Sequence, residues 1–265
     1  KVLVTGAAGF IGSHVVGELL AREYEVVALD NLSGGFRSNL DGRATFVEGS
    51  ILDVELVDRL FDEHRFAYVF HLAAYAAEGL SHFIRRHNYT NNVLGSVNLI
   101  NAAVNHGVRC FVFTSSIAVY GRAEVPIAEV APRIPEDPYG IAKLAVEQDL
   151  AAAAEIFGLR SIVFRPHNVY GERQNLADPY RNVVGIFMNE VLRGRPCTVF
   201  GDGSQTRSFC YRDDLVNVII DMMNNESGFV GPVNIGNPTE FTIRELAQHV
   251  IQLSDSKSKL VERPL

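Results

Sequence analysis

The stretch TGAAGFIGSH at residues 5–14 directly follows a short apolar run at residues 2–4. Within it, Gly6, Gly9 and Gly12 are spaced as GxxGxxG. Such glycines allow a tight turn from a strand into a helix, and they let backbone N–H groups approach a pyrophosphate at the positive end of that helix. The stretch therefore predicts a dinucleotide site, although close packing of strand and helix would explain the same glycines.

The segments that follow this stretch alternate between two kinds. Apolar and β-branched runs typical of strands lie at 2–6, 25–30, 44–49, 68–74, 110–116 and 161–166. Helix-length segments lie at 10–22, 53–64, 82–106, 138–157, 180–194, 213–225 and 242–253. Two of these helices begin with capping chemistry, namely Asp53 and the pair Thr242 and Glu245. The alternation predicts an α/β fold of the Rossmann type, a doubly wound parallel sheet with helices on both faces.

The pattern becomes less regular after Pro166, where loops replace the strand-and-helix repeats. We therefore expect a cofactor-binding domain over 1–166, to which 205–235 returns. A smaller substrate-binding lobe is expected over 167–204 and 236–265. The chain opens without an initiator Met and ends in a charged stretch. Both ends are thus expected to be cropped, and the C-terminus to be incomplete.

The composition excludes several classes of protein. Of the 265 residues 47% are hydrophobic and 21% charged, which is enough to bury a sizeable core. A net charge of −7 argues against a nucleic-acid binder, whose affinity rests on clustered Lys and Arg. Three scattered cysteines lack the paired spacing of a zinc or redox site, so we expect no metal and a reducing, cytoplasmic setting. No apolar run approaches the roughly 20 residues of a membrane span.

Two further strand ends carry residues suited to a dinucleotide. Asp30 ends the second predicted strand, where a carboxylate accepts hydrogen bonds from a ribose and repels a 2′-phosphate, so NAD is favoured over NADP. Arg37 lies close enough to weaken this preference. Asp53 is expected either to contact the adenine edge or to cap a helix. Ala73 and Ala74 are small enough to let a cofactor lie against the sheet edge, and they would also suit plain packing.

A second group of residues carries acid-base chemistry. Tyr139 and Lys143 are four residues apart at the start of a predicted helix and share one face. A free phenol titrates near pH ~10, and a neighbouring ammonium lowers that value, so Tyr139 could accept a proton from a sugar hydroxyl. Ser116 at the end of the fifth strand could bond the reacting oxygen. Thr114 and Ser115 are expected to be structural and to satisfy backbone groups.

Eight segments of the chain, in order, resemble the motifs of one family. They are TGAAGFIGSH, DNLSGG, HLAA, NNVLGSVNLINAA, TSSIAVYG, PYGIAK, RPHNVYG and FGDGSQTRSFCYRDDL, and they span nearly the whole chain. Together they are similar to the extended short-chain dehydrogenases, and within them to the NAD-dependent nucleotide-sugar epimerase and dehydratase group. The resemblance implies the Rossmann-type fold, NAD as cofactor, a UDP-sugar as substrate and a homodimer built on helices 82–106 and 138–157.

The resemblance also implies roles for the matching positions. Cofactor contacts are expected from Gly6, Gly9, Phe10, Ile11, Gly12, Asp30, Asn31, Ile51, Asp53, Leu72, Ala73, Ala74, Asn92, Tyr139 and Lys143. Ser116 and Tyr139 would handle protons, and Lys143 would bind the ribose and activate Tyr139. Asn92 and His167 would also serve as structural or cofactor-supporting positions.

For the substrate, the resemblance implies contacts from Ser116, Asn168 and Arg207. Asn168 and Arg207 would clamp the nucleotide diphosphate, because a guanidinium binds phosphate through two parallel hydrogen bonds. As an alternative, Arg207 would pair with Asp213 or Asp214. Asp214 is in addition expected to cap a helix rather than to contact the ligand.

One departure from related subgroups bears on the reaction. The 4,6-dehydratases of this group carry an Asp-Glu pair just before their Val-Tyr-Gly motif, and UDP-glucuronate decarboxylases carry a Glu there. This chain has Ile117 and Ala118, neither of which transfers a proton. C4 epimerisation of a UDP-hexose through a 4-keto intermediate is thus favoured, with the glucose, N-acetyl and uronic acid forms left open. The alternatives are another NAD-dependent nucleotide-sugar dehydrogenase, dehydratase or decarboxylase, and a non-catalytic NAD-binding regulator.

Overall fold

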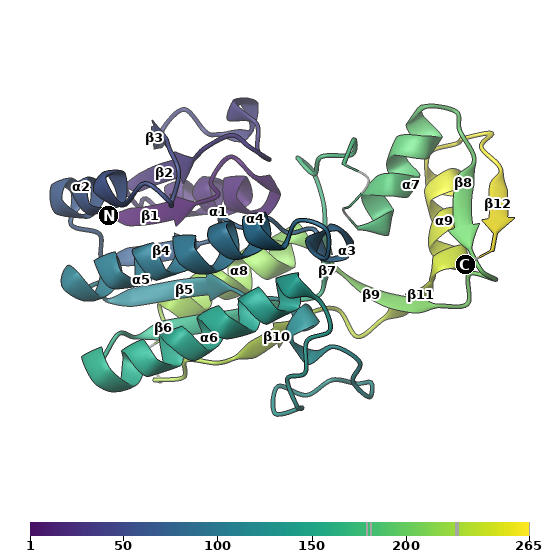
Figure 1. Ribbon diagram of the computed structural model, residues 1–265. Coiled ribbons are helices and arrows are strands. Elements are labelled where there is room, and N and C mark those ends of the chain that lie inside the picture. Colours follow the sequence, from purple (N-terminus) through teal and green to yellow (C-terminus); the bar gives the residue numbers. More distant parts are fainter. Residues whose placement is uncertain (179, 181, 226–227, 265) are drawn as a thin grey trace.

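The centre of the molecule is a seven-stranded sheet (Figure 1). The computed structural model describes residues 1–178, 180, 182–225 and 228–264. The strand order is β3-β2-β1-β4-β5-β6-β10, and every neighbouring pair is parallel. The strands are β1 (Val2–Thr5), β2 (Val26–Asp30), β3 (Thr45–Glu48), β4 (Tyr68–His71), β5 (Cys110–Thr114), β6 (Ser161–Pro166) and β10 (Val233–Ile235). Because all seven run the same way, their carboxyl ends meet along one edge of the sheet.

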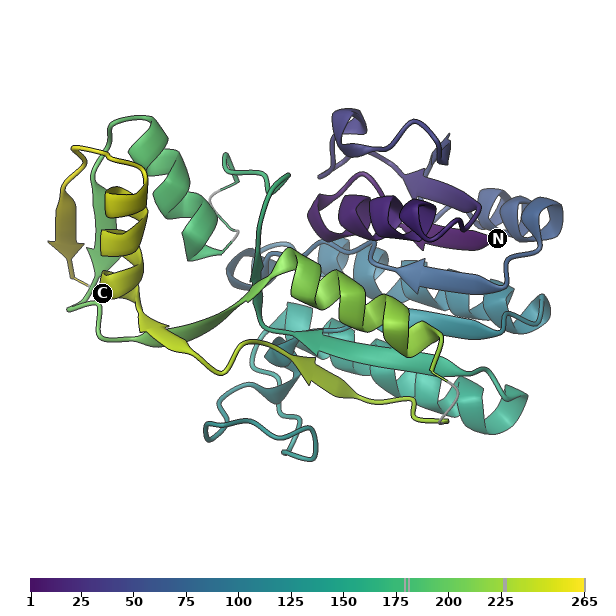
Figure 2. The ribbon, with the colours of Figure 1, turned by 180° about the vertical axis from the view of Figure 1, so that it is seen from behind.

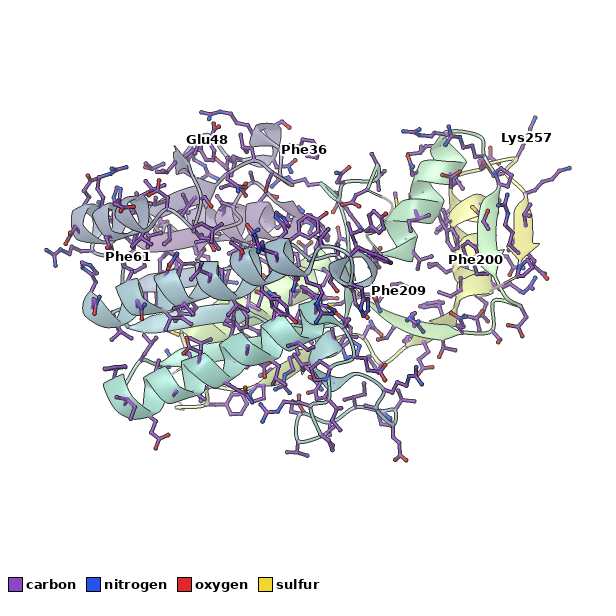
Figure 3. The ribbon with its side chains drawn as sticks, viewed as in Figure 1. Phe36, Glu48, Phe61, Phe200, Phe209 and Lys257 are labelled. Carbon is purple, nitrogen blue, oxygen red and sulfur yellow. The ribbon has the colours of Figure 1, made fainter. Side chains whose placement is uncertain are left out.

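Helices cover both faces of this sheet, as Figures 1 and 2 show from opposite sides. On one face α1 (Phe10–Ala21) and α8 (Arg212–Met223) pack in a single buried cluster with the strands. On the other face α2 (Val54–His64), α5 (Gly95–Asn105) and α6 (Pro138–Phe157) form a second cluster. Phe61 of α2, labelled in Figure 3, is fully buried there. The predicted doubly wound Rossmann-type fold is confirmed.

Local capping chemistry fixes several helix ends. Asp137 accepts from the Gly140 N–H at the start of α6, and Pro138 occupies the first turn. Asp53 accepts from the Leu56 N–H at 2.9 Å, which confirms the predicted cap of α2. The helix α9 (Ile243–Leu253) begins with a reciprocal capping box between Thr242 and Glu245, also as predicted.

The prediction of a single helix over 82–106 was wrong in detail. The chain forms α3 (Glu78–Ser81), α4 (Arg85–Tyr89), a π-helical turn η2 (Thr90–Leu94) and then α5. Asn92 explains the interruption, because its amide bonds the backbone of Tyr75, with Nδ2 also donating to Asn88. Two short 3-10 turns, η1 (Arg37–Asn39) and η3 (Ile117–Tyr120), complete the irregular helices.

No strand was predicted after Pro166, which was also wrong. Besides β10, this part forms β7 (Asn168–Tyr170), β8 (Cys197–Phe200), β9 (Thr206–Tyr211), β11 (Glu240–Thr242) and β12 (Leu260–Arg263). Strand β9 lies between β7, to which it is parallel, and β11, to which it is antiparallel. Strands β8 and β12 form a separate parallel pair. Most of these strands have only three or four residues, too few to produce a clear alternation.

The pair β8 and β12 belongs to a smaller packed unit beside the main sheet (Figures 1 and 2). The helices α7 (Val183–Leu192) and α9 pack against β8, around buried Phe187, Cys197 and Ala247. The predicted helix 180–194 is therefore present but shorter. Residue 181 of this predicted helix, and residues 179, 226, 227 and 265 of the predicted domain ranges, lie outside the described residues. The predicted domain boundaries stay a prediction.

Within the described ranges, no helix is both long and apolar enough to cross a membrane. The three cysteines, Cys110, Cys197 and Cys210, are free and buried. No group of three or more His, Cys, Asp or Glu side chains in the described part of the chain is arranged to hold a metal ion.

Candidate active site

The glycine turn after β1 is packed too closely for any other residue. Gly6 has a positive φ of 68°, and a Cβ there would lie 2.7 Å from the backbone nitrogen of Ala73. A Cβ on Gly12 would lie 2.1 Å from the carbonyl oxygen of Gly6. Gly9 is the N-cap of α1 and brings no capping side chain to its first turn. Phe10 and Ile11 open that helix. Bare backbone at a helix N-terminus suits a pyrophosphate, so the turn fits the predicted dinucleotide.

Asp30 connects the end of β2 to this turn. Its carboxylate accepts from the backbone N–H of Ala8 at 2.9 Å and of Leu32 at 2.7 Å. A carboxylate has about four acceptor positions, so two remain for the hydroxyls of a ribose. Asn31 begins the next loop, where its Oδ1 accepts from the Ser33 backbone and hydroxyl. A ribose contact by Asp30 or Asn31 stays a prediction, and their position beside the glycine turn supports it.

A buried chain of hydrogen bonds fixes the end of β4 against β1. The Ala73 N–H donates to Thr5 Oγ1 at 3.3 Å, and Thr5 lies 2.8 Å from His71 Nδ1. His71 Nε2 lies 2.8 Å from Ser96 Oγ, which in turn donates to the carbonyl of Asn92. Since Ser96 donates onward, His71 must donate from Nε2 and accept from Thr5 at Nδ1. Leu72 and Ala74 flank Ala73, so this network fixes the position of the three residues at the sheet edge where the cofactor is predicted to lie.

The remaining predicted cofactor positions have structural partners. Asn92 is 2% exposed, and its amide holds the backbone of Tyr75, which places it under the loop after β4. Ile51 packs against Gly95 of α5, where a Cβ would lie 2.5 Å from its Cδ1. Asp53 uses Oδ1 for the helix cap and is exposed. Direct NAD contacts by these three residues stay predictions.

Tyr139 and Lys143 lie one turn apart on α6, as predicted, and both are buried. Lys143 Nζ lies 5.7 Å from the centre of the Tyr139 ring and donates to the carbonyl of Thr114 at 2.7 Å. Burial lowers the pKa of Lys143 to about 7, and the carboxylate of Glu147 opposes that shift. Burial, and then the charge of Lys143, lowers the pKa of His71 to about 3, so this imidazole is neutral.

Ser116 lies directly after β5 and opposite the start of α6. Its Oγ accepts from the Ala118 N–H at 3.1 Å and so caps η3. The turn η3 packs against α6 so closely that a Cβ on Gly140 would lie 2.5 Å from the Ala118 carbonyl oxygen. Gly140 follows Tyr139, so the fold brings Ser116, Tyr139 and Lys143 together. Ile117 and Ala118 are the first two residues of η3 and carry no acid or base.

The predicted diphosphate clamp lies on the short strands β7 and β9. Asn168 Nδ2 donates to the Ser208 carbonyl at 3.0 Å, which ties the two strands together. Arg207 is exposed, and its Nη1 donates to the Thr206 carbonyl at 2.7 Å. Phe209, labelled in Figure 3, lies one strand position beyond Ser208. The role of the clamp stays a prediction.

The structure revises what was expected around this clamp. Asp213 pairs with Arg212. The cap assigned to Asp214 was wrong: α8 starts at Arg212 with Tyr211 as its N-cap residue, so Asp214 lies inside the first turn. A carboxylate in that turn still interacts favourably with the helix dipole. His167 Nδ1 lies 3.2 Å from Ser208 Oγ, and burial lowers the pKa of this imidazole.

Sequence reasoning missed a buried carboxylate beside the predicted catalytic residues. Glu147 lies one turn beyond Lys143 on α6 and is 6% exposed. It accepts from Ser115 and forms an ion pair with Arg165, which is 0% exposed. Ser115 was expected to satisfy backbone groups and instead donates to this side chain. The spacing of four residues from Lys143 could have indicated Glu147, whereas Arg165 gives no signal in the sequence.

Comparisons with known proteins agree with this geometry. The family model of the NAD dependent epimerase/dehydratase family matches residues 2–236. A UDP-glucose 4-epimerase of Mycolicibacterium smegmatis is 39% identical over 255 residues, which cover 93% of this chain and 80% of that protein.

Solved structures show the same likeness. The UDP-glucose 4-epimerase of Thermotoga maritima, crystallised with UDP-glucose, is 39% identical with a TM-score of 0.95, covering 99% of this chain and 85% of that one. A dTDP-glucose 4,6-dehydratase of Streptomyces venezuelae with NAD bound is 30% identical with a TM-score of 0.89, covering 99% and 84%. The chain belongs to the NAD-dependent epimerase/dehydratase family, and it is an enzyme whose cofactor is NAD.

Proposed function

We propose that the enzyme interconverts the C4 epimers of a UDP-hexose of the glucose and galactose type. One observation carries this proposal: Lys143 donates to the Thr114 carbonyl at the end of β5, and η3, which Ser116 caps, packs on the helix that carries Tyr139, while Ile117 and Ala118 offer no further acid or base. Inversion at C4 needs one group that removes and returns the hydroxyl proton. Elimination of water or loss of CO₂ needs more than that.

The residues of this chain divide the work as follows. Tyr139 accepts the proton of the C4 hydroxyl and later returns it, while Ser116 donates a hydrogen bond to the same oxygen. Lys143, when protonated, favours the phenolate of Tyr139 and so lowers its pKa. The glycine turn at Gly6 and the carboxylate of Asp30 hold NAD in this proposal. When bound, NAD supplies a reversible hydride acceptor for C4.

Arg207 and Asn168 complete the substrate site in this proposal by binding the diphosphate. We further propose that residues 1–166 and 205–235 form the NAD-binding domain and that residues 167–204 and 236–265 form the nucleotide-sugar lobe, with Arg207 reaching the diphosphate from the NAD-binding domain. The likeness to epimerases whose names include UDP-glucose supports this choice of substrate.

A carboxylate near the sugar position favours a neutral hexose over a uronic acid. Glu78 begins α3, which packs on the start of α6 through a 3.4 Å hydrogen bond between Ser81 Oγ and Asp137 Oδ1. The pKa of Glu78 is raised by partial loss of hydration and by the Asp137 carboxylate, and it is lowered by the charge of Arg207. The charges of Asp137 at the start of α6 and of Arg207 in the proposed clamp both act on Glu78, so an ionised Glu78 would repel a second carboxylate bound near them.

We also propose that the enzyme is a homodimer. Leu94 of η2 and Ile141 of α6 are 52% and 41% exposed, although they belong to neighbouring helices that otherwise pack together. Pairing of this face with its copy would bury both. Light scattering coupled to size-exclusion chromatography tests the proposal, which a monomer at micromolar concentration would contradict.

A product assay against UDP-glucose, UDP-N-acetylglucosamine and UDP-glucuronate tests the main proposal. We expect UDP-galactose from the first substrate without added NAD, because an epimerase regenerates its oxidised cofactor in every cycle. Accumulation of NADH in step with product would instead indicate a dehydrogenase. A 4-keto-6-deoxy sugar or a pentose as product would indicate a dehydratase or a decarboxylase.

A further inference from the structure

A buried polar cluster lies behind the end of β5, next to the proposed catalytic residues but separate from them. Ser115 is 2% exposed and donates from Oγ to Glu147 Oε1 at 2.6 Å. Arg165 donates to the same carboxylate through two parallel bonds, from Nε to Oε1 at 2.9 Å and from Nη2 to Oε2 at 2.6 Å. Both oxygens of Glu147 are thus held in one orientation.

A buried ion pair is by itself weak evidence that these polar side chains are there for stability. Removing two charges from water costs so much that well-packed apolar residues of similar volume often serve a core equally well or better. Arg165 is fully buried and Glu147 nearly so. A polar cluster with fixed directions does, however, specify one geometry where apolar packing would allow several. The role of the cluster can therefore be inferred from the residues that it connects.

Two side chains, one turn apart, tie the end of β5 to α6. Lys143 donates to the carbonyl of Thr114 at 2.7 Å, and Glu147 accepts from the hydroxyl of Ser115. Within the sheet the Ser115 N–H donates to the Phe164 carbonyl at 2.7 Å, which leaves the direction of the strand end relative to α6 to the two side-chain contacts. Two contacts at successive residues fix its direction, and with it the position of Ser116, the next residue.

The same cluster also fixes the far end of η3. Arg165 Nη1 donates to Tyr120 Oη at 2.6 Å, and Tyr120 Oη donates to Asn234 Oδ1 of β10 at 2.8 Å. Tyr120 is the last residue of η3, and Ser116 caps its first turn. The turn that carries Ser116 is therefore held at both ends, while its middle packs on the residue after Tyr139.

We propose that Ser115 and Glu147 are positioning residues of the epimerase: their hydrogen bond fixes Ser116 relative to Tyr139 and Lys143. This inference rests on the proposed function, since it assigns a task to residues behind the proposed catalytic group. Neither residue needs to touch substrate or cofactor for it. Loss of this hydrogen bond should lower kcat rather than raise KM, because a misplaced Ser116 disturbs the reacting geometry without removing any contact to the nucleotide.

Ser115→Ala is the sharpest test, because it removes the hydrogen bond and leaves the ion pair between Glu147 and Arg165 intact. We expect kcat for UDP-glucose to fall about tenfold and KM to stay within about twofold, as for a small displacement of a reacting group. NAD should remain bound. Ser115→Thr restores the hydroxyl and should recover most of kcat. Ser161→Ala is the matched control: it removes a buried serine from the amino end of β6.

The outcomes separate the inference from the function on which it rests. Loss of kcat in Ser115→Ala, recovery in Ser115→Thr and normal kcat in Ser161→Ala support the positioning role. Normal kcat in Ser115→Ala overturns it, as does a loss that Ser161→Ala shares in proportion to its fall in unfolding temperature. A loss that Ser115→Thr does not reverse also overturns it. A wild-type enzyme that converts no UDP-sugar overturns the proposed function and this inference with it.

Discussion

At the residue scale the proposed chemistry depends first on Tyr139. Replacing it by Phe removes the proton acceptor and preserves the ring that packs near Lys143. We expect Tyr139→Phe to retain NAD while kcat falls by about 10²- to 10⁴-fold, the usual contribution of a general acid-base group. Steady-state kinetics together with the absorbance of bound cofactor measure both effects. Undiminished turnover at neutral pH would exclude Tyr139 as the base.

Lys143 links the site to the stability of the protein. Its pKa is lowered by burial from 10.5 to about 7, so between these values the folded protein holds fewer protons than the unfolded chain. Stability should therefore rise with pH between about 7 and 10 and be lowest where Lys143 is charged in both states. The slope from this one group is at most about 1.4 kcal/mol per pH unit.

Urea unfolding at pH 7 and pH 9 tests this expectation when the wild type is compared with Lys143→Met. The methionine has a similar length and no charge to bury. We expect the rise in unfolding free energy between the two pH values to be smaller in the variant. An equal rise in both proteins would assign the pH dependence to other groups.

Arg207 is the residue whose role depends most on the substrate. Its guanidinium is exposed on β9, and the backbone contact at Thr206 leaves most of its donors for other partners. Arg207→Ala should weaken UDP binding by about ten- to a hundredfold, because a charge-assisted hydrogen bond is lost. Titration calorimetry measures this, with Arg43→Ala as a control for the loss of a surface charge. Equal UDP affinity in wild type and Arg207→Ala would remove Arg207 from the clamp.

At the scale of elements, α6 was predictable because residues next to each end determine where the helix begins and ends. Asp137 and Pro138 start the helix, and Gly158 at a φ of 71° ends it, so the predicted bounds of 138–157 are those observed. The strands β7, β10 and β11 were missed because three residues form no period, and their partners decide their conformation. The interruption at η2 was missed because it depends on a contact between Asn92 and Tyr75.

The site residues likewise divide into those that local motifs indicate and those that only contacts between distant segments bring together. Gly6, Tyr139 and Lys143 belong to short motifs, so their proximity to a strand end or to one another could be predicted from spacing. Ser115 and Glu147 are 32 residues apart, and only the packing of α6 on β5 brings them together. Long-range polar contacts of this kind leave no periodic trace in a sequence.

The start of α2 offers a test of two roles for one side chain. Asp53 caps the helix with Oδ1, and the proposed adenine contact would use Oδ2. Asp53→Ala should cost about 1 kcal/mol of unfolding free energy, whereas Asp53→Asn should cost almost none, because Asn is an equally good cap. NAD affinity should fall in both, since the Asn amide turns a donor toward the adenine amino group. Unchanged NAD affinity in Asp53→Asn would leave only the cap.

At the scale of the whole molecule, the parallel sheet explains why distant segments share one site. The glycine turn follows β1, Ala73 follows β4 and Ser116 follows β5, and these three strands lie side by side in the order β1-β4-β5. The short strands β7 and β9 extend from the same edge toward the smaller unit (Figures 1 and 2). In the proposed function, NAD and the sugar can therefore meet at this one edge.

The lack of an acid or base at Ile117 and Ala118 predicts the fate of the hydrogen at C4. Ile117 and Ala118 of η3 bring no acid or base that could remove or deliver a proton at carbon, so we expect the hydrogen taken from C4 to return there without meeting solvent. A dehydratase or a decarboxylase passes through an intermediate that is reprotonated at carbon. In D₂O we therefore expect the C4-inverted UDP-sugar with no carbon-bound deuterium by NMR or mass spectrometry. Stoichiometric deuterium at C5 would contradict epimerisation, and it would require an acid-base group beside Tyr139 from outside η3.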